Sequence, residues 1–300
     1  MKNLLKLMDL SEKEIIEILN TADQLKFEKK NGIPHRLLEG KTLGLIFAKS
    51  STRTRVSFEV GMFDLGGTSL FLSSRDLQIG RGEIVQDTAR VLSRYLDGIM
   101  IRTFDQKEVE ALAEFGTIPI INGLTDYCHP CQVLADLMTI REYKGDFAGR
   151  KLCYVGDGNN MTNSLIVGGI KLRMKVAVAC PKGYEPDAEI MKWAYATGDF
   201  ECGEDVLEMA KDSDVLYTDV WASMGQEAEA EERKKVFKQY QINDKVLGVS
   251  RPDAMVLHCL PAHREEEITS KVFEEHSKEI FDEAENRLHA QKAVLVKCLR

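Results

Sequence analysis

Apolar residues along the first half of the chain fall into two alternating patterns. Short continuous apolar runs predict buried strands, and the stretches between them carry apolar residues at every third or fourth position, the spacing of a helix that covers a core. The predicted strands are 42–47, 68–72, 98–102 and 118–121, and the predicted helices are 11–32, 56–65, 84–95, 107–115 and one that begins at 130. This alternation is typical of a parallel sheet covered by helices.

The second half repeats the alternation. Strands are predicted at 152–155, 176–179, 215–220 and from 256 to Cys259, and helices through 165–170 and at 187–196, 206–210, 227–239 and 280–300. The glycine-containing segment 144–149 lies between the halves and predicts a link. With 300 residues, 44% of them apolar, the chain can bury two cores. We therefore expect an α/β fold with two doubly wound parallel-sheet domains.

Charge and cysteine content narrow the class of protein. The formal net charge of -8 disfavours nucleic-acid binding but is compatible with a small anionic substrate held by local arginines. The seven cysteines, an odd number, do not resemble the framework of a secreted disulfide protein, so we expect a reducing, cytoplasmic compartment. Charges interrupt the first nine residues, and no apolar run approaches membrane-spanning length. We expect neither a signal peptide nor a membrane partner.

The turn after strand 42–47 has the sequence Ser51-Thr52-Arg53-Thr54-Arg55 and leads into a helix. Hydroxyl and guanidinium groups therefore lie at a helix N-terminus, where unpaired N–H groups and the positive end of the helix dipole favour an anion. We interpret the turn as a phosphate cradle. The alternative is that Ser51 or Thr52 only caps the helix and that the arginines are solvated.

Two features of the first half belong with this turn. Arg102 ends a predicted strand, and ligands of parallel sheets lie outside the carboxyl ends of the strands, so Arg102 should point into the same crevice as the turn. An ordinary surface arginine is the alternative. The segment 73–83, which contains Gln78 and Arg81, is polar and rich in glycine. We expect a mobile loop that closes on a ligand.

The stretch Cys128-His129-Pro130-Cys131-Gln132 leads into an apolar helix whose first turn suits Pro130. The Cys-x-x-Cys spacing allows a redox interpretation, in which the helix start lowers a thiol pKa. No second cysteine pair supports a zinc site. We favour the alternative that His129 and Gln132 are polar groups directed into the crevice.

Three places in the second half carry candidate chemistry. The turn Gly156-x-Gly158 suggests a dinucleotide site only weakly, because the third glycine and an acidic residue after the next strand are missing. The stretches 219–225 and 258–261 begin at the ends of predicted strands and should open onto the crevice. For Cys259 the alternative is a buried, inert thiol. Taken alone, Arg287 is typical of a helix surface.

Together, several stretches resemble the signature of the aspartate/ornithine carbamoyltransferase family, in order and across essentially the whole chain. The first two are shared by the wider family, and the Ser-Met-Gly loop and the His-Cys-Leu-Pro strand resemble its ornithine branch. The matching residues are Ser51–Arg55, His129–Gln132, Asp219 with Ser223–Gly225, His258–Pro261 and Glu283–Arg287.

The resemblance implies a carbamoyl phosphate-binding domain at 1–143, an ornithine-binding domain at 144–277, and a C-terminal helix at 278–300 that returns to the first domain. It also implies a homotrimer or an assembly of trimers. Gln78 would come from a neighbouring subunit, in the role that a lysine of the aspartate enzyme fills near the position of Arg81. The role of Arg81 itself stays unassigned.

The resemblance also implies the roles of the site residues. Phosphate would be held by the turn, and the carbamoyl group by strand-end and helix-start residues; the full carbamoyl phosphate set is Ser51, Thr52, Arg53, Thr54, Gln78, Arg102, His129, Gln132, Cys259, Leu260 and Arg287. The ornithine set is Asn160, Asp219, Ser223 and Met224. The residues expected to act in catalysis are Thr54, Arg102, His129, Asp219 and Cys259, with Cys259 and Leu260 flanking the reacting amine.

The implied reaction is attack of the ornithine side-chain amine on carbamoyl phosphate, giving L-citrulline and phosphate in the biosynthesis of arginine or in its catabolism. We expect no metal and no organic cofactor, because phosphate is already a good leaving group and the arginines neutralise it. Three alternatives stay open. They are a carbamoyltransferase for aspartate or putrescine, a nicotinamide-dependent dehydrogenase, and an anion-binding protein without catalysis.

Overall fold

The computed structural model describes residues 1–75, 77–78, 82–222 and 227–300. The chain divides into two compact units, Met1–Met138 with Asn286–Arg300, and Thr139–Glu285. Both divisions fall inside helices, α5 (Pro130–Lys144) and α12 (Ser277–Leu299). The domain limits predicted from sequence, 143/144 and 277/278, lie at the end of α5 and at the start of α12.

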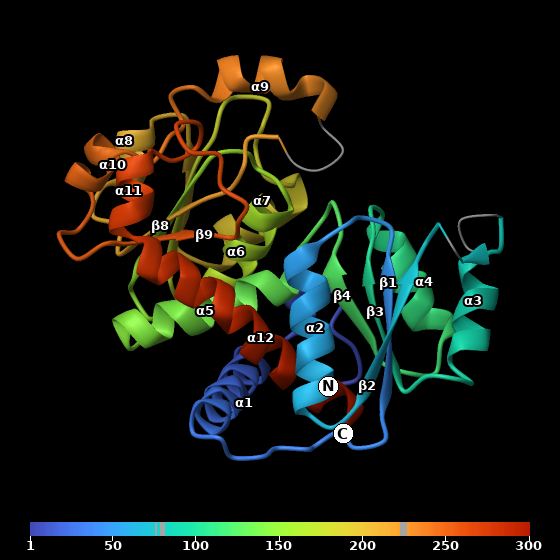
Figure 1. Ribbon diagram of the computed structural model, residues 1–300. Helices are drawn as coiled ribbons and strands as arrows, with labels where there is room; N and C mark the ends of the chain where they lie inside the picture. The colour runs from blue at the N-terminus through green and yellow to red at the C-terminus, as the bar shows by residue number, and fades with distance from the viewer. Residues whose placement is uncertain (76, 79–81, 223–226) are drawn as a thin grey trace. The chain divides into compact units, whose positions relative to one another are not determined.

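The first unit contains a parallel sheet with strand order β2-β1-β3-β4. Figure 1 shows α2 on one side of this sheet and α3 and α4 on the other, as right-handed crossovers require. The strands are β1 (Thr42–Phe47), β2 (Thr68–Ser73), β3 (Gly98–Arg102) and β4 (Ile120–Leu124), and the helices are α1 (Glu12–Lys30), α2 (Thr52–Asp64), α3 (Val85–Leu92) and α4 (Gln106–Phe115).

Local sequence explains most of these boundaries. Ser11 and Glu14 form the capping box that begins α1, and Asp105 caps α4. Strand β4 begins and ends later than the predicted 118–121, because it continues through the buried Asn122 and Gly123, which break the apolar run in the sequence. Phe47 and Arg102 are paired residues at the carboxyl ends of β1 and β3, so the turn after β1 and Arg102 share one sheet edge.

The second unit contains a parallel sheet with strand order β7-β6-β5-β8-β9. The strands are β5 (Lys151–Val155), β6 (Lys175–Ala179), β7 (Phe200–Gly203), β8 (Val215–Thr218) and β9 (Met255–His258), and the helices are α6 (Asn160–Lys171), α7 (Ala188–Thr197), α8 (Val206–Ala210), α9 (Ala230–Phe237), α10 (Asp244–Val249) and α11 (Ser270–Glu275). Short 3-10 turns occupy Leu7–Asp9 and Glu227–Glu229. The two parallel-sheet units confirm the predicted α/β fold.

The sequence did not predict β7, α10 or α11. Strand β7 is a four-residue edge strand with one buried side chain, so it lacks a continuous apolar run. In Figure 1, α6 and α7 cover one side of the second sheet, while α8, α10 and α11 cover the other. The core beneath the second group includes Trp221, Phe237 and Tyr240.

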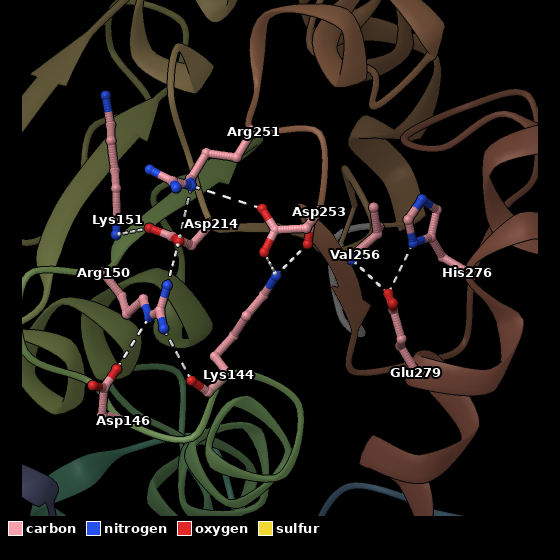
Figure 2. Close-up of polar contacts among 10 residues, drawn as sticks. All are labelled: Lys144, Asp146, Arg150, Lys151, Asp214, Arg251, Asp253, Val256, His276 and Glu279. Atoms are coloured by element: carbon pink, nitrogen blue, oxygen red, sulfur yellow. Dashed lines mark hydrogen bonds and ion pairs between the residues drawn. The ribbon is translucent and has the colours of Figure 1, made fainter.

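Ion pairs close the amino edge of the second sheet, as Figure 2 shows. Asp214, which precedes β8, accepts hydrogen bonds from the Lys151 backbone N–H at 2.9 Å and from Arg150 at 3.1 Å. Arg150 also donates to Asp146 at 3.1 Å and to the Lys144 carbonyl at 3.0 Å. Lys144 in turn pairs with Asp253. These contacts connect the start of β5 with the residue before β8, and the end of α5 with the segment before β9.

None of the helices in the described part of the chain combines the length and the apolar character that crossing a bilayer requires.

Candidate active site

The turn after β1 forms the start of α2. Ser51 is the N-cap of this helix, and its hydroxyl accepts a hydrogen bond from the Thr54 N–H at 3.2 Å. Thr54 is buried within the first helical turn, while Arg55 stacks on Phe71, 3.7 Å from the ring centre. Ser51 thus caps the helix, as the alternative interpretation of this turn expected. The same geometry leaves a helix N-terminus that can receive an anion.

Buried guanidinium groups converge on Thr54. Its hydroxyl accepts hydrogen bonds from Arg287 at 3.3 Å and from Arg102 at 3.5 Å. Arg287 also donates to the side-chain oxygen of Gln132 at 2.6 Å and to Gln291 at 3.0 Å. The oxygens of Thr54, Gln132 and Gln291 that accept these hydrogen bonds are uncharged. Arg287, which looked like a surface residue in the sequence, lies in this cluster.

His129 is buried beside the same arginines. Burial, together with the charges of Arg287, Arg102 and Arg53, holds the pKa of its imidazole well below the ordinary value. The ring is therefore neutral at neutral pH, with one N–H that can donate. Thr54, Arg102, His129, Gln132 and Arg287 come together from four elements in the first unit.

The cysteines beside His129 are not redox groups. Burial raises the pKa of Cys128 and of Cys131 to about 12, whereas a thioredoxin-like site needs a lowered thiol pKa. The Cys131 thiol lies 3.4 Å from the Asn122 carbonyl, to which it donates. The redox interpretation of this motif is wrong, because the helix start is enclosed by the core.

The segment after β2 contains Gln78, which is exposed and whose carbonyl accepts a hydrogen bond from the Glu83 N–H at 3.1 Å. Arg81 lies outside the described residues, as do Ser223 and Met224 of the predicted ornithine set.

Asp219 is the centre of a second cluster, in the second unit. Its carboxylate accepts hydrogen bonds from the side-chain amide of Asn159 at 3.1 Å and from the thiol of Cys259 at 3.1 Å. The Val220 N–H, at 2.8 Å, fixes the orientation of the carboxylate. The cluster thus joins residues that follow β5, β8 and β9 at the carboxyl edge of the sheet.

The structure assigns Asn159 a place that sequence reasoning missed. Asn159 is the N-cap of α6 and accepts from the N–H groups of Met161 and Thr162, at 2.9 and 3.2 Å. Its amide nitrogen remains directed at Asp219. The predicted Asn160 is the first residue of α6, one position further on. The preference of asparagine for N-caps was the signal in the sequence that could have identified Asn159.

The chain around Cys259 is held on both sides. The His258 N–H donates to Glu283 at 2.9 Å, and Nε2 of the ring lies 2.9 Å from Glu267. Nδ1 accepts from the Leu260 N–H at 2.9 Å, so Nε2 carries the proton and donates to the glutamate. Leu260 has φ of +57°, a conformation that costs a non-glycine residue energy and that this hydrogen bond helps to hold.

Asp219, His258 and Cys259 have the ligand types and spacing of a cation site, with potential ligand atoms within 4.8 Å of one another. Both ring nitrogens of His258 are engaged, however, one by Glu267 and one by the Leu260 N–H. A metal ion could use His258 only after one of those hydrogen bonds breaks.

The turn Gly156-x-Gly158 does not form a dinucleotide site. The Gly158 N–H donates to the Tyr184 carbonyl at 2.8 Å, and a Cβ added at Gly158 would lie 2.3 Å from the backbone of Glu185. The chain's own loop after β6 therefore occupies the position that a pyrophosphate would need. This observation removes the main support for the dehydrogenase alternative.

Family models account for both halves of the chain. Residues 2–142 match the carbamoyl-P binding domain of aspartate/ornithine carbamoyltransferases, and residues 148–298 match the Asp/Orn binding domain. The chain belongs to the aspartate/ornithine carbamoyltransferase family. The resemblance read from the motifs is thereby confirmed, and the two domain models together span nearly the full length.

Individual members of this family are similar over the same length. An ornithine carbamoyltransferase from Thermococcus kodakarensis is 55% identical, over 98% of this chain and 95% of the relative. The structure of ornithine carbamoyltransferase from Pyrococcus furiosus has a TM-score of 0.95 at 56% identity, covering 99% of this chain and 97% of that one. An anabolic ornithine carbamoyltransferase from Campylobacter jejuni has a TM-score of 0.93 at 41% identity, with both chains fully covered.

Proposed function

We propose that this protein transfers the carbamoyl group of carbamoyl phosphate to the side-chain amine of L-ornithine, giving L-citrulline and phosphate. The observation that carries the donor is the buried cluster of Thr54, Arg102, His129, Gln132 and Arg287 at a helix N-terminus. The acceptor is inferred from relatives named ornithine carbamoyltransferase that are similar over the full length. The relative named anabolic favours a role in arginine biosynthesis.

The first unit supplies the groups for the donor. In this proposal Ser51, Thr52, Arg53 and Thr54 hold the phosphate at the start of α2, and Arg102, His129, Gln132 and Arg287 surround the carbamoyl group. Gln78 completes the site from a neighbouring subunit. We expect no metal or organic cofactor, because the phosphate leaving group is already activated and the arginines stabilise its charge.

Attack of the amine places negative charge on the carbonyl oxygen of carbamoyl phosphate. Thr54, Arg102 and His129 are proposed to donate hydrogen bonds to that oxygen. Donors held in place before the reaction contribute roughly 3–4 kcal/mol each in well-studied enzymes. His129 acts as a neutral donor rather than as an acid, since its pKa is well below the ordinary value. The amine nitrogen forms the new bond to carbon, and the departing phosphate takes the proton.

The second unit supplies the groups for ornithine. Asn160, Asp219, Ser223 and Met224 are proposed to bind its amino-acid end, and Cys259 and Leu260 to flank the reacting amine. An alkyl amine has a pKa of about 10.4, so at neutral pH only a small fraction of ornithine has the deprotonated, nucleophilic side-chain amine. Activity should therefore increase with pH. Asp219 and Cys259, hydrogen-bonded to each other, are the candidates to orient the amine.

A homotrimer is supported by apolar surfaces of the first unit. One surface joins α2 and β2 through the exposed side chains of Val56, Val60, Phe63, Leu70 and Phe71. Another lies around α3, on the opposite side of the sheet, and includes Ile84, Val91 and Tyr95. A cyclic trimer needs two different surfaces that bind each other, and we propose that these two surfaces do so. Phe63→Glu should shift the native mass to that of a monomer; an unchanged mass would contradict this interface.

We place the protein in the cytoplasm, because its seven cysteines, all within the described ranges, are free thiols. The function is tested by supplying purified protein with carbamoyl phosphate and ornithine and measuring citrulline. Aspartate and putrescine serve as competing acceptors, and a preference for either would overturn the acceptor. Binding of carbamoyl phosphate without turnover on any amine would favour an anion-binding protein instead.

A further inference from the structure

Arg233 lies on α9, belongs to neither substrate-binding set, and is buried at the carboxyl edge of the second sheet. Its Nη1 donates to the Asp157 carboxylate at 2.8 Å and to the Trp221 carbonyl at 3.0 Å. Its Nε donates to Glu229 at 3.1 Å. One guanidinium therefore connects the turn after β5, the chain after β8 and the start of α9.

Aromatic rings complete the surroundings of Arg233. Its guanidinium lies 5.1 Å from the centre of the Tyr184 ring and 5.9 Å from that of Phe237. Phe237 packs edge-on against Tyr184, with ring centres 4.9 Å apart, and the carbonyl of Tyr184 holds the Gly158 N–H. The loop after β6 is thereby included in the same arrangement. A cation enclosed in this way has few alternative positions.

The residues that Arg233 binds lie two positions from the Asn159–Asp219 pair. Asp157 precedes Asn159 by two residues, and Trp221 follows Asp219 by two residues. Asn159 donates a hydrogen bond to Asp219 at 3.1 Å, and Asp219 also accepts one from the Cys259 thiol. A shift of either flanking segment would change the distance between them.

We infer that Arg233 is a positioning residue for ornithine binding, which sets the separation of Asn159 and Asp219 by holding Asp157 and the Trp221 carbonyl. Arg233 itself contacts neither substrate. The inference rests on the proposed function, because it assigns the Asn159–Asp219 pair to the ornithine side of the reaction. Replacing Arg233 should therefore weaken the binding of ornithine and leave the binding of carbamoyl phosphate unaffected.

Arg150 provides a matched control in the same sheet. It also donates to a buried aspartate, an exposed carboxylate and a backbone carbonyl, namely Asp214, Asp146 and Lys144 (Figure 2). Arg150 immediately precedes β5, whereas Asp157, the partner of Arg233, follows β5. Replacing either arginine by methionine removes the same kinds of hydrogen bond, but only one replacement lies near Asp219.

The experiment compares Arg233→Met, Arg233→Lys and Arg150→Met in steady-state assays of citrulline formation, with melting temperatures recorded. We expect the KM for ornithine to rise about tenfold or more in Arg233→Met, and less in Arg233→Lys, while the KM for carbamoyl phosphate changes less than about twofold. Arg150→Met should lower the melting temperature and leave both KM values near those of the wild type.

The double variant Arg233→Met/Asp157→Asn removes the carboxylate that the single variant leaves buried and unpaired, and it is used if Arg233→Met does not fold. A folded single or double variant with the wild-type KM for ornithine would overturn the inference, as would equal increases in both KM values. Absence of citrulline formation by the wild-type protein would overturn the proposed function instead, so the two failures are distinguishable.

Discussion

Strand β8 has an aspartate at each end, and the two have opposite surroundings. Asp214, before the strand, is enclosed by the Lys151 N–H, Arg150 and Arg251, so cations and a backbone donor neutralise its charge. Asp219, after the strand, is met by an amide, a thiol and the adjacent N–H, none of them charged. The charge of Asp214 is thus neutralised by two arginines, whereas the three partners of Asp219 are uncharged and leave its carboxylate able to pair with a cationic amine.

The pKa values of neighbouring carboxyl groups show the same contrast. At the amino edge, the hydrogen bond and charge of Lys144 lower the pKa of Asp253 below its usual value. At the carboxyl edge, burial raises the pKa of Asp157 to about 6, in spite of the opposing charge of Arg233. Lys144 therefore stabilises the charged form of Asp253, whereas the ion pair with Arg233 does not fully offset the cost of burying Asp157.

The largest expected effect is at the carboxyl end of β8. Asp219→Asn should lower kcat/KM for ornithine on the order of 10²-fold, because a charge-assisted hydrogen bond to the amine is worth roughly 1.5–3 kcal/mol. Steady-state assays at saturating carbamoyl phosphate measure this effect. The melting temperature should change little. Turnover close to that of the wild type would show that the uncompensated charge of Asp219 serves neither substrate.

The matched change at the other end of β8 should act on stability. Asp214→Asn leaves Arg150 and Arg251 without their shared carboxylate, and because these arginines are 30% and 52% exposed and can be solvated, we expect a cost of roughly 1.5–3 kcal/mol, the value of a hydrogen bond to a charged group. Chemical denaturation should show this decrease in the free energy of unfolding, while kcat and both KM values stay within about twofold. A large loss of activity in a fully folded Asp214→Asn protein would contradict the assignment of Asp214 to stability and of Asp219 to substrate binding.

Asp157 should make stability depend on pH. Because its pKa is raised to about 6 in the folded protein, the native state keeps a proton that the unfolded chain releases near about pH 3.8. The native state thus binds more protons between these values, and the free energy of unfolding should fall as pH rises from about 4 to about 6. The loss is up to about 3 kcal/mol. Denaturation curves of the wild type and Asp157→Asn should differ in this window; identical pH dependence would count against the raised pKa.

The smallest expected effect is at Cys259. Serine in its place can still donate to Asp219, so Cys259→Ser should keep activity within about tenfold of the wild type. Any remaining difference in pH dependence is sought in a range that brackets the reference pKa of a free thiol, about 8.5. Rates and ornithine affinity measured from pH 6 to 9 test this. Profiles that coincide over the whole range would remove the thiol from any role in orienting the amine.

The chain alone was sufficient for several of these conclusions. Alternating apolar runs and helical periodicity predicted the parallel sheets, because buried strands and amphipathic helices each have a characteristic local pattern of apolar residues. The turn Ser51–Arg55 was placed correctly at the start of α2, and the motif resemblance led to the family that the domain models confirm. Caps and turns depend on neighbours within four residues, so they can be predicted from the sequence without knowledge of the fold.

Only the tertiary structure decided which distant side chains meet. It placed Arg287 on Thr54 and Gln132, showed that Asn159 contacts Asp219, and connected Arg233 to Asp157. It also revealed β7, whose few residues gain their structure from pairing with β6. These contacts depend on strand order and register, which bring together residues separated by dozens of positions, and no local pattern of apolar and polar residues records them.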